Sequence, residues 1–255
     1  MTMKIGAQLY TVRNFCQSEG DIDASFAKVA QMGYEYIQVS GLADIGAENM
    51  RRLADKHELK IILSHSSPDR VRLDTDKLIA EHKIMGADYI GIGSMPEGYR
   101  GSRAGVEAFI ADFLPAAQNI AAAGLHFMYH NHDFEFAKID GKLVFDYLVE
   151  GFSPREMGFV LDTFWVQAGG DDPAVWLKKL AGRLDTIHFK DYGMSADGKR
   201  IMLPILEGNL NWERIFAACE DSGAAYAFIE QDDCNGADPF ECLKLSLDNL
   251  RARGY

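Results

Sequence analysis

The chain has 255 residues and a mass of 28.4 kDa, and 47% of its residues are hydrophobic and 25% charged, so it is long enough to bury one substantial core. These proportions exclude intrinsic disorder, a collagen-like chain and a small disulfide-stapled domain. The formal net charge of −12 repels a phosphate backbone, which argues against nucleic acid as a partner.

Short runs of β-branched and aromatic residues recur along the chain and predict eight strands. They cover residues 4–10, 36–40, 60–66, 89–94, 125–131, 158–163, 186–191 and 226–232. Most are followed by a longer stretch whose apolar residues have helical spacing. These stretches cover residues 23–33, 47–58, 75–86, 106–124, 173–182, 211–223 and 239–254. The fifth unit is the least regular, and residues 133–151 predict a loop or small hairpin before a short helix.

Glycines mark the ends of the expected helices. Five of them stand between a helical pattern and the next strand, where a left-handed residue is needed, namely Gly33, Gly86, Gly124, Gly182 and Gly223. Alternating strands and helices favour parallel pairing through right-handed crossovers. Eight such units predict an α/β fold, a closed (β/α)8 TIM barrel, in a single domain over residues 1–255. An open doubly wound sheet is the alternative, but the chain has neither GxGxxG nor GxxxxGK[ST].

Polar residues gather where the expected strands end. The long polar loops also follow strands, on the face where barrels of this kind bind ligands. Strand residues two apart share a face, so the side chains within each strand end can be sorted by parity. The residues concerned are His65, His130, His132, Asp162, His188, Lys190, Glu230 and Asp232. Isolated charges inside a barrel are costly unless they are paired or bind a metal, so the clustering predicts a ligand cage.

Asp162, His188 and Glu230 are the residues expected to share a metal ion. Structural alternatives remain, since Asp162 could cap the following turn and Glu230 could pair with Lys190 or Arg13. Lys190 could be a lysine at the barrel rim that pairs with Asp191 or Asp162. Two carboxylates with one or two imidazoles suit Mn²⁺, Co²⁺, Fe²⁺ or Zn²⁺ better than Mg²⁺ or Ca²⁺.

Several motifs together resemble the sugar phosphate isomerase/epimerase family of xylose isomerase-like TIM barrels. They are GAQLYTVR, YHNHDFEF, LDTFWVQAGGDDP, IHFKD, EGNLNW and IEQDD, and they span nearly the whole chain. Relatives include ketose 3-epimerases, inosose dehydratases and enzymes that act on 3-keto-glycosides. The resemblance implies a divalent metal, first Mn²⁺, with Zn²⁺, Co²⁺, Fe²⁺ or Mg²⁺ as alternatives.

The resemblance also implies four metal ligands. Asp162, His188 and Glu230 match three of them, and His130 or His132 stands where relatives usually have the first glutamate. Gln38 replaces a frequent Glu, and Trp165 stands where several relatives have a His. The replacement of a glutamate by histidine changes both the available base and the charge of the site.

These residues lead to a hypothesis of proton abstraction next to a carbonyl of a sugar or polyol, through a metal-stabilised enediolate. Epimerisation, isomerisation and elimination from an inosose or 3-keto-glycoside would share that intermediate. The expected catalytic residues are Glu230, His130, His132 and Lys190. The expected substrate-binding residues are Tyr10, His65, Phe134, Trp165 and Tyr192. Two alternatives are a catalytically decayed sugar-binding barrel and a phosphodiesterase that resembles apurinic-site endonucleases.

The remaining expectations concern location and partners. No apolar run approaches the roughly 20 residues of a membrane span, and the first residues do not resemble a secretory signal, so a cytoplasmic protein is expected. Its four cysteines show no CxxC spacing and are expected to be reduced and mostly buried. The expected partner is a small, unphosphorylated sugar or polyol. The helix over 239–254 is a candidate surface for a homo-oligomer.

Overall fold

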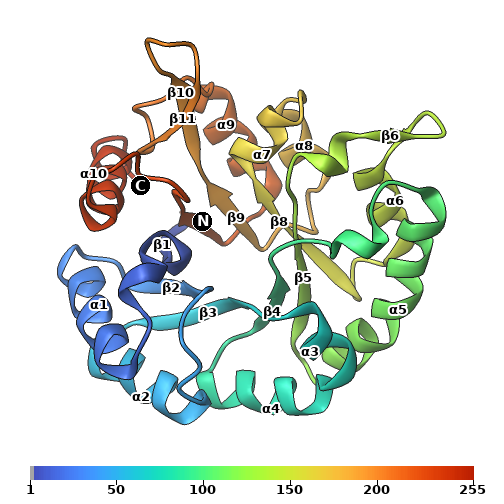
Figure 1. Ribbon diagram of the computed structural model, residues 1–255, viewed down its shortest axis with the longest axis horizontal. Helices are drawn as coiled ribbons and strands as arrows, with labels where there is room; N and C mark the ends of the chain where they lie inside the picture. Colours follow the sequence, from blue (N-terminus) through green and yellow to red (C-terminus); the bar gives the residue numbers. More distant parts are fainter. Residues whose placement is uncertain (1–2) are drawn as a thin grey trace.

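Eight parallel strands close into a barrel in the computed structural model, which describes residues 3–255 (Figure 1). The strands are β1 (Lys4–Gln8), β2 (Tyr36–Val39), β3 (Lys60–His65), β4 (Tyr89–Ile92), β5 (His126–His130), β8 (Met157–Asp162), β9 (Thr186–Phe189) and β12 (Tyr226–Ile229). Their order around the barrel is β1-β12-β9-β8-β5-β4-β3-β2. Each predicted strand is present, and the predicted single-domain TIM barrel is confirmed.

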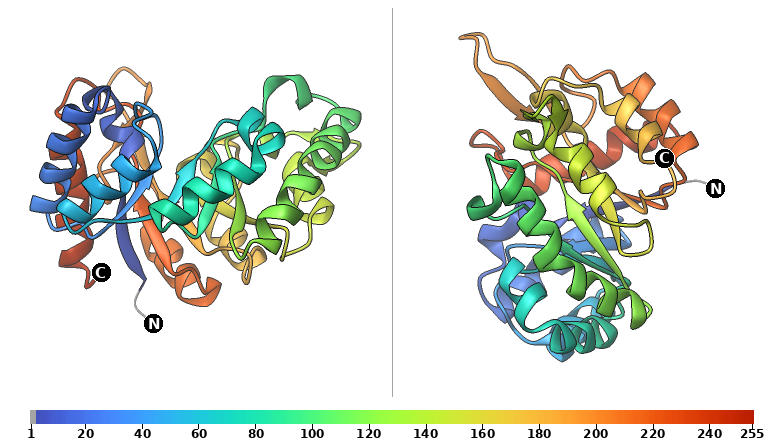
Figure 2. Two further views of the ribbon diagram at one scale, coloured as in Figure 1. Left: turned by 90° about the horizontal axis from the view of Figure 1, so that it is seen from below. Right: turned by 90° about the vertical axis from the view of Figure 1, so that its right-hand side faces the viewer.

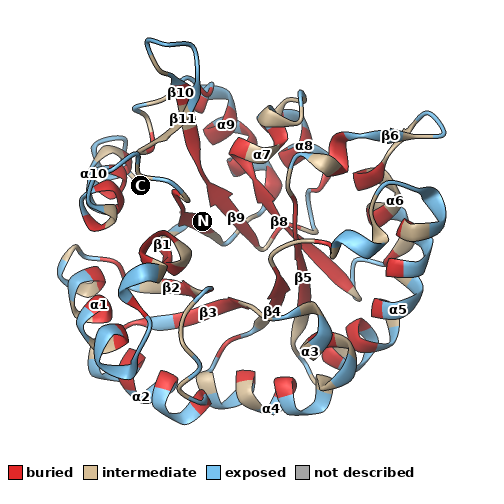
Figure 3. Cartoon of the chain, in the orientation of Figure 1, coloured by how far each residue is buried: buried red, intermediate tan, exposed pale blue. Residues whose placement is uncertain are grey.

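Helices surround the barrel, and their inner faces are buried against the strands while their outer faces are exposed (Figures 1 and 3). They are α1 (Glu19–Gln31), α2 (Ala47–Lys56), α3 (Pro68–Leu73), α4 (Thr75–Met85), α5 (Arg103–Ala122), α6 (Val144–Gly151), α7 (Thr163–Ala168), α8 (Pro173–Lys179), α9 (Trp212–Ser222) and α10 (Pro239–Ala252). The five glycines predicted to end helices all have a positive φ, between 73° and 96°. Within residues 3–255, no helix combines the length and the apolar character that crossing a bilayer requires.

The barrel interior changes from apolar to polar along the strands. Below the C-terminal ends of the strands, the interior contains a small buried cluster of Leu63, Met128 and Val160, separate from the main core. Two positions further along the same three strands are His65, His130 and Asp162. Because residues two apart share a face, the layer above the apolar cluster consists of imidazole and carboxylate side chains.

Two hairpins interrupt the regular alternation. β6 (Lys138–Ile139) and β7 (Lys142–Leu143) form the small hairpin that was predicted before α6. β10 (Asp191–Met194) and β11 (Arg200–Leu203) form a second one, which projects from the body of the molecule (Figure 2, right). The sequence predicted only a polar loop there. The available signal was the Asp197–Gly198 pair, which is typical of hairpin turns, and Gly198 does have a positive φ of 80°.

Candidate metal centre

Four side chains from four strands meet at the open end of the barrel. His130 and Asp162 end β5 and β8, His188 lies in β9, and Glu230 directly follows β12. All four are buried, and one potential ligand atom from each lies within 4.8 Å of the others. The structure therefore brings together the ligand set that was expected from the sequence.

The distances place both imidazoles against carboxylates. His188 Nδ1 lies 2.9 Å from Glu230 Oε2 and 3.8 Å from Asp162 Oδ2. His130 Nε2 lies 3.2 Å from the same Asp162 oxygen. Asp162 also caps α7, because its Oδ1 accepts a hydrogen bond from Trp165 N at 3.0 Å. The two interpretations of Asp162, a cap and a ligand, are therefore compatible.

The hydrogen-bond partners of the two imidazoles determine which nitrogen carries the hydrogen. His130 Nδ1 is 2.9 Å from the carbonyl oxygen of Gly93, and His188 Nε2 is 2.7 Å from Gln38 Oε1. Both partners are acceptors, so these nitrogens donate and the other nitrogen of each ring presents a lone pair to a carboxylate. A lone pair that faces a carboxylate is repelled unless a cation lies between them. The donor set therefore fits a bound metal ion.

A proton can play the same part when no metal is bound. Burial lowers the pKa of His188, but the charges of Glu230 and Asp162 outweigh it and raise the pKa above its usual value. Burial alone would raise the pKa of Asp162, yet Lys190 and His130 hold it well below its usual range. Metal binding at this cluster would therefore displace a proton from an imidazole.

Lys190 brings a buried ammonium group to the same place. Its Nζ lies 2.8 Å from Asp232 Oδ2, 3.1 Å from Glu230 Oε2 and 3.4 Å from Asp162 Oδ2. Burial lowers the pKa of Lys190, but these three carboxylates raise it above its usual value. Three carboxylates against one ammonium leave two uncompensated negative charges while the imidazoles are neutral. A divalent cation would balance them.

Asp191, one of the two structural partners proposed for Lys190, has another role. Its carboxylate accepts hydrogen bonds from the backbone of residues 206–210 and from Trp212 Nε1, the last at 2.6 Å. Asp162, the other proposed partner, does contact the ammonium group. Lys190 is therefore held by the carboxylates of Asp162, Glu230 and Asp232, beside the candidate metal ligands.

Residues around His130 hold the centre in place, and the sequence did not single them out. Asn131 Oδ1 accepts a hydrogen bond from Asp162 N at 3.0 Å. The fully buried Glu135 accepts hydrogen bonds from Tyr129 Oη at 2.6 Å and from His132 N at 2.9 Å. These bonds fix the loop after β5 relative to β8.

We expect Glu135 to make folding stability depend on pH. Burial raises the pKa of its carboxyl to about 7 from the ordinary 4.5. A raised carboxyl pKa gives stability that is complete below pH 4.5 and is lost as the pH rises through 7. The Glu135→Gln variant keeps the shape of the side chain without its charge. Its free energy of unfolding, relative to that of wild type, should therefore rise by about 3 kcal/mol between pH 4 and pH 8.5. Urea unfolding at several pH values measures this difference.

The control for that measurement is Glu220→Gln, on the exposed face of α9. Its difference from wild type should stay constant over the same pH range. An equally constant difference for Glu135→Gln would contradict the assignment of a buried, proton-dependent carboxyl.

His65 and His132 flank the cluster and have free polar atoms. The His65 ring lies 5.3 Å from that of His130 and 5.6 Å from that of His188, and the His132 ring lies 5.0 Å from that of His130. Burial lowers the pKa of His65 well below its usual value and that of His132 to about 3. Both rings are therefore neutral at physiological pH and can accept or donate a hydrogen bond.

Three of the predicted aromatic residues, Phe134, Trp165 and Tyr192, lie on one side of the site. The ring of Trp165 lies 4.8 Å from that of His132, and the Phe134 ring stacks on the His132 ring at 6.1 Å. Tyr192 lies beyond Phe164, at 5.0 Å between ring centroids. Tyr10 follows β1, where the Arg13 guanidinium stacks on its ring at 4.1 Å. The rings of Phe134, Trp165, Phe164 and Tyr192 therefore form one wall with His132, and Tyr10 lies apart from them.

Two glutamines at the mouth were not predicted as site residues. Gln8 is the last residue of β1 and Gln38 the last but one of β2, the two lie opposite each other in register, and both are fully buried. From the sequence, Gln38 stood out only as a replacement for a glutamate, and Gln8 had no expected part. Both could have been predicted in the same way as the histidines, because each is a polar residue in the last two positions of its strand.

Unpartnered polar atoms concentrate around the cluster. Among residues 3–255, ten buried side-chain nitrogen or oxygen atoms have no hydrogen-bond partner, and seven of them belong to the mouth of the barrel. The seven are Gln8 Nε2, Gln38 Nε2, His65 Nε2, His132 Nδ1, Trp165 Nε1, His188 Nδ1 and Asp232 Oδ1. Buried polar groups are rarely left unpaired, so this concentration indicates a binding site for a polar ligand.

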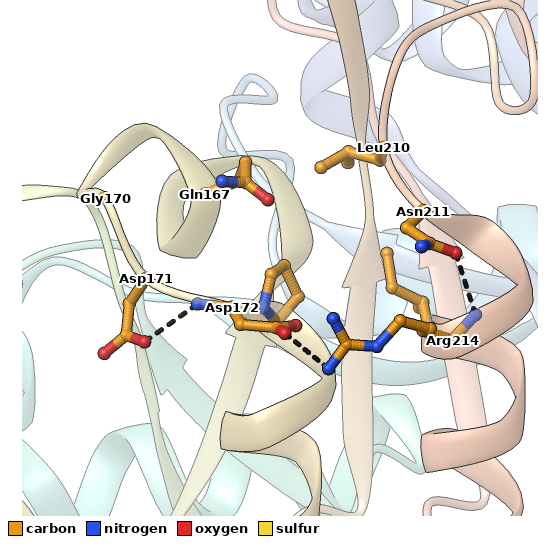
Figure 4. A pocket seen from close by; sticks show the side chains of 9 residues that line it. Gln167, Gly170, Asp171, Asp172, Leu210, Asn211 and Arg214 are labelled. Carbon is orange, nitrogen blue, oxygen red and sulfur yellow. Dashed lines mark hydrogen bonds and ion pairs between the residues drawn. The ribbon is translucent and has the colours of Figure 1, made fainter.

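Of three cavities beside the mouth, one of about 370 Å³ is lined by His65 at the end of β3. The remaining two adjoin each other. One of about 350 Å³ is lined by residues of the α7–α8 connection and the start of α9, where Asp172 and Arg214 form an ion pair at 2.7 Å (Figure 4). It contains none of the predicted site residues. The other, of about 630 Å³, adjoins it through Gln167 and Leu210 and is lined by Tyr192.

Comparisons with known proteins agree with this architecture. A crystal structure of a sugar phosphate isomerase/epimerase from Parabacteroides distasonis superposes with a TM-score of 0.82 at 21% identity, covering 99% of this chain and 94% of that one. An L-ribulose 3-epimerase structure has a TM-score of 0.74 at 18% identity, covering 98% and 94% of the two chains. The IolI protein with a bound zinc atom has a TM-score of 0.72 at 14% identity, covering 98% and 97%.

At these identities the likeness shows a shared fold. No match is found among curated proteins. The family model described as "Xylose isomerase-like TIM barrel" matches residues 26–251, most of the chain. The resemblance seen in the sequence motifs is thereby confirmed, and the chain belongs to the xylose isomerase-like TIM barrel family.

Proposed function

We propose that this protein is a divalent-metal-dependent enzyme that moves a proton next to a carbonyl group of a sugar or polyol. The seven unpartnered buried polar atoms around the four-residue cluster carry the proposal. The metal would give His188 Nδ1 a partner, and a hydroxyl-rich ligand could do so for the other six atoms, since every hydroxyl can both donate and accept. The epimerase and the zinc-bound protein among the structures of the same fold are consistent with this chemistry.

His130, Asp162, His188 and Glu230 would hold the metal, with Mn²⁺ first and Zn²⁺, Co²⁺, Fe²⁺ or Mg²⁺ as alternatives. When bound, the metal would supply Lewis acidity that stabilises negative charge on a substrate oxygen. Gln38 and the Gly93 carbonyl orient the two imidazoles, and Asn131 ties the Asp162 backbone to the loop after β5.

Glu230 and His132 are the two groups placed to move protons. Glu230 follows β12 and His132 follows β5, and two strands separate β12 from β5 around the barrel, so the groups reach a bound substrate from different sides. Burial raises the pKa of Glu230, but Lys190 and His188 lower it far below its usual value, which keeps it ionised. His132 is neutral and its Nδ1 is free. A pair of groups on two sides suits epimerisation.

A second candidate function is elimination or dehydration, and Lys190 supports it. Its ammonium group is buried among carboxylates at the cluster, where it could donate a hydrogen bond to a leaving hydroxyl and stabilise its developing charge. The complete donor set argues against a decayed sugar-binding barrel. The net charge of −12 argues against a phosphodiesterase that acts on nucleic acid.

The proposed function is tested by incubating metal-loaded protein in D₂O with ketoses, inososes and 3-keto-glycosides. Deuterium should enter one carbon next to the carbonyl of at least one substrate, and elemental analysis of the same preparation should find a divalent metal. Absence of deuterium uptake across the panel, with metal present, would contradict the proposal.

Gln38→Leu should lower metal affinity about 10- to 100-fold, because the His188 ring loses the acceptor that holds its hydrogen on Nε2. Isothermal titration of metal-free protein with Mn²⁺ measures the change. The control is Gln31→Leu on the exposed end of α1, which should leave the affinity unchanged. Equal affinities of the Gln38→Leu variant and wild type would exclude this orienting role.

We also propose that the protein works in the cytoplasm. All four cysteines are free, as predicted, and Cys16, Cys219 and Cys242 are buried. Free thiols are the usual state in a reducing compartment.

A further inference from the structure

A row of rings leads from the metal centre toward the β10–β11 hairpin. The His132 ring lies 5.0 Å from that of His130 and 4.8 Å from that of Trp165. Trp165 is 4.6 Å from Phe164, and Phe164 is 5.0 Å from Tyr192. We call His132, Trp165, Phe164 and Tyr192 the aromatic row. It begins beside His130, a proposed metal ligand, and is continuous over three different strand ends.

The aromatic row combines apolar faces with polar atoms that lack partners. Trp165 and Tyr192 are half-buried, so part of each ring is accessible. Trp165 Nε1 and His132 Nδ1 are buried without a hydrogen-bond partner. The Lys190 ammonium lies 5.4 Å from the Trp165 ring centroid. Aromatic faces with adjacent donors suit a ring that has an apolar face and a polar edge.

A cavity of about 630 Å³ lies at the far end of the aromatic row, between α7 and the hairpin. Tyr192 lines it together with Gln167, Asn209 and Arg200, whose side chains form no hydrogen bond with any residue from 3 to 255. Asn209 N donates to Tyr192 O at 2.7 Å. A Cβ on Gly193 would lie 2.6 Å from Asn209 Oδ1, so the glycine lets this amide lie against the hairpin. The volume is within the usual range for small-molecule sites.

We propose that the substrate is a two-ring glycoside, with its reacting sugar at the metal centre and its second ring on the aromatic row, reaching the cavity beside Tyr192. This inference rests on the proposed function, since it takes the reacting sugar to bind at the cluster. The second ring is either a sugar or an aryl group, because both present a flat apolar face. A monosaccharide would leave the outer half of the aromatic row and the cavity unused.

The test compares one-ring and two-ring probes by isothermal titration against Mn²⁺-loaded protein. The one-ring probes are glucose, galactose, mannose and xylose, and the two-ring probes are their phenyl glycosides and disaccharides that contain them. At least one two-ring probe should bind 10-fold or more tightly than its one-ring parent. If the phenyl glycosides show the larger gain in affinity, the second ring is an aryl group. If the disaccharides show it, the second ring is a sugar. Equal affinities in every pair, or no binding of any two-ring probe, would overturn the proposal.

Gln167→Trp gives a second test, because Gln167 is exposed and a larger side chain there should fill the cavity without disturbing the fold. The two-ring advantage should fall below 2-fold. The matched control is Arg214→Ala in the neighbouring cavity, which should keep the full advantage (Figure 4). If the Gln167→Trp variant still bound two-ring probes with the full 10-fold preference, the second ring would not lie in the cavity beside Tyr192. Metal content and deuterium uptake on the same preparations report separately on the proposed function.

Discussion

Replacing Glu230 by Gln is expected to slow deuterium uptake into substrate by 10²- to 10⁴-fold, the usual contribution of a general base. Glu230 is buried at the metal centre, 2.9 Å from His188 and 3.1 Å from Lys190, and these two groups keep it ionised. The amide that replaces it has the same shape but accepts no proton. Uptake from D₂O, followed by NMR at saturating metal, measures the loss.

Metal content decides how the Glu230→Gln result is interpreted, because the residue is also a proposed ligand. Weaker binding of Mn²⁺ with normal exchange at saturation would leave Glu230 a ligand and exclude it as the base. Wild-type exchange together with wild-type metal affinity would exclude both roles. The control is Glu241→Gln, at an exposed position of α10, and this variant should exchange deuterium at the wild-type rate.

Lys190→Met is expected to destabilise the metal-free protein by about 3–5 kcal/mol, the usual cost of removing one partner from a buried charge network. The methionine fills similar space but deprives the carboxylates of Asp162, Glu230 and Asp232 of the ammonium group that lies against all three. Urea unfolding in the presence of a chelator measures the loss. The double variant Lys190→Met/Asp232→Asn should recover part of it, because one uncompensated charge is removed.

The control for this experiment is Lys178→Met, which removes an exposed lysine that lies 3.4 Å from Asp221. Exposed ion pairs contribute about 1 kcal/mol or less, so little stability should be lost. Similar losses in the two lysine variants would contradict a charge network at the metal centre.

The fold could be predicted from the sequence because local signals agree with the tertiary structure. Strand runs, helical periodicity and glycine positions such as Gly86 and Gly223 mark the same boundaries that the barrel requires. The polar layer could be predicted as well, since His65, His130 and Asp162 follow apolar residues of the same parity. Which residues of a strand share a face depends only on their spacing within that strand, so it can be predicted without knowing the neighbouring strand.

What the sequence could not show are relations between strands. Nothing in it predicts that Gln38, 150 residues before His188, determines which nitrogen of that ring carries the hydrogen. The buried partners of Glu135 likewise depend on how the loop after β5 folds back. For Lys190 the sequence left Asp191 and Asp162 open as partners, and only the three-dimensional arrangement separates them.

The most direct test of the metal centre is a titration of metal-free protein with Mn²⁺ and, separately, Zn²⁺, for wild type and for Asp162→Ala. Asp162 lies near both imidazoles, so its loss removes a ligand and the carboxylate that faces them. We predict one ion per wild-type chain and at least 100-fold weaker binding in the variant, a loss larger than that of an orienting partner. Wild-type protein that binds neither ion, or an Asp162→Ala variant that binds as tightly as wild type, would contradict the metal centre.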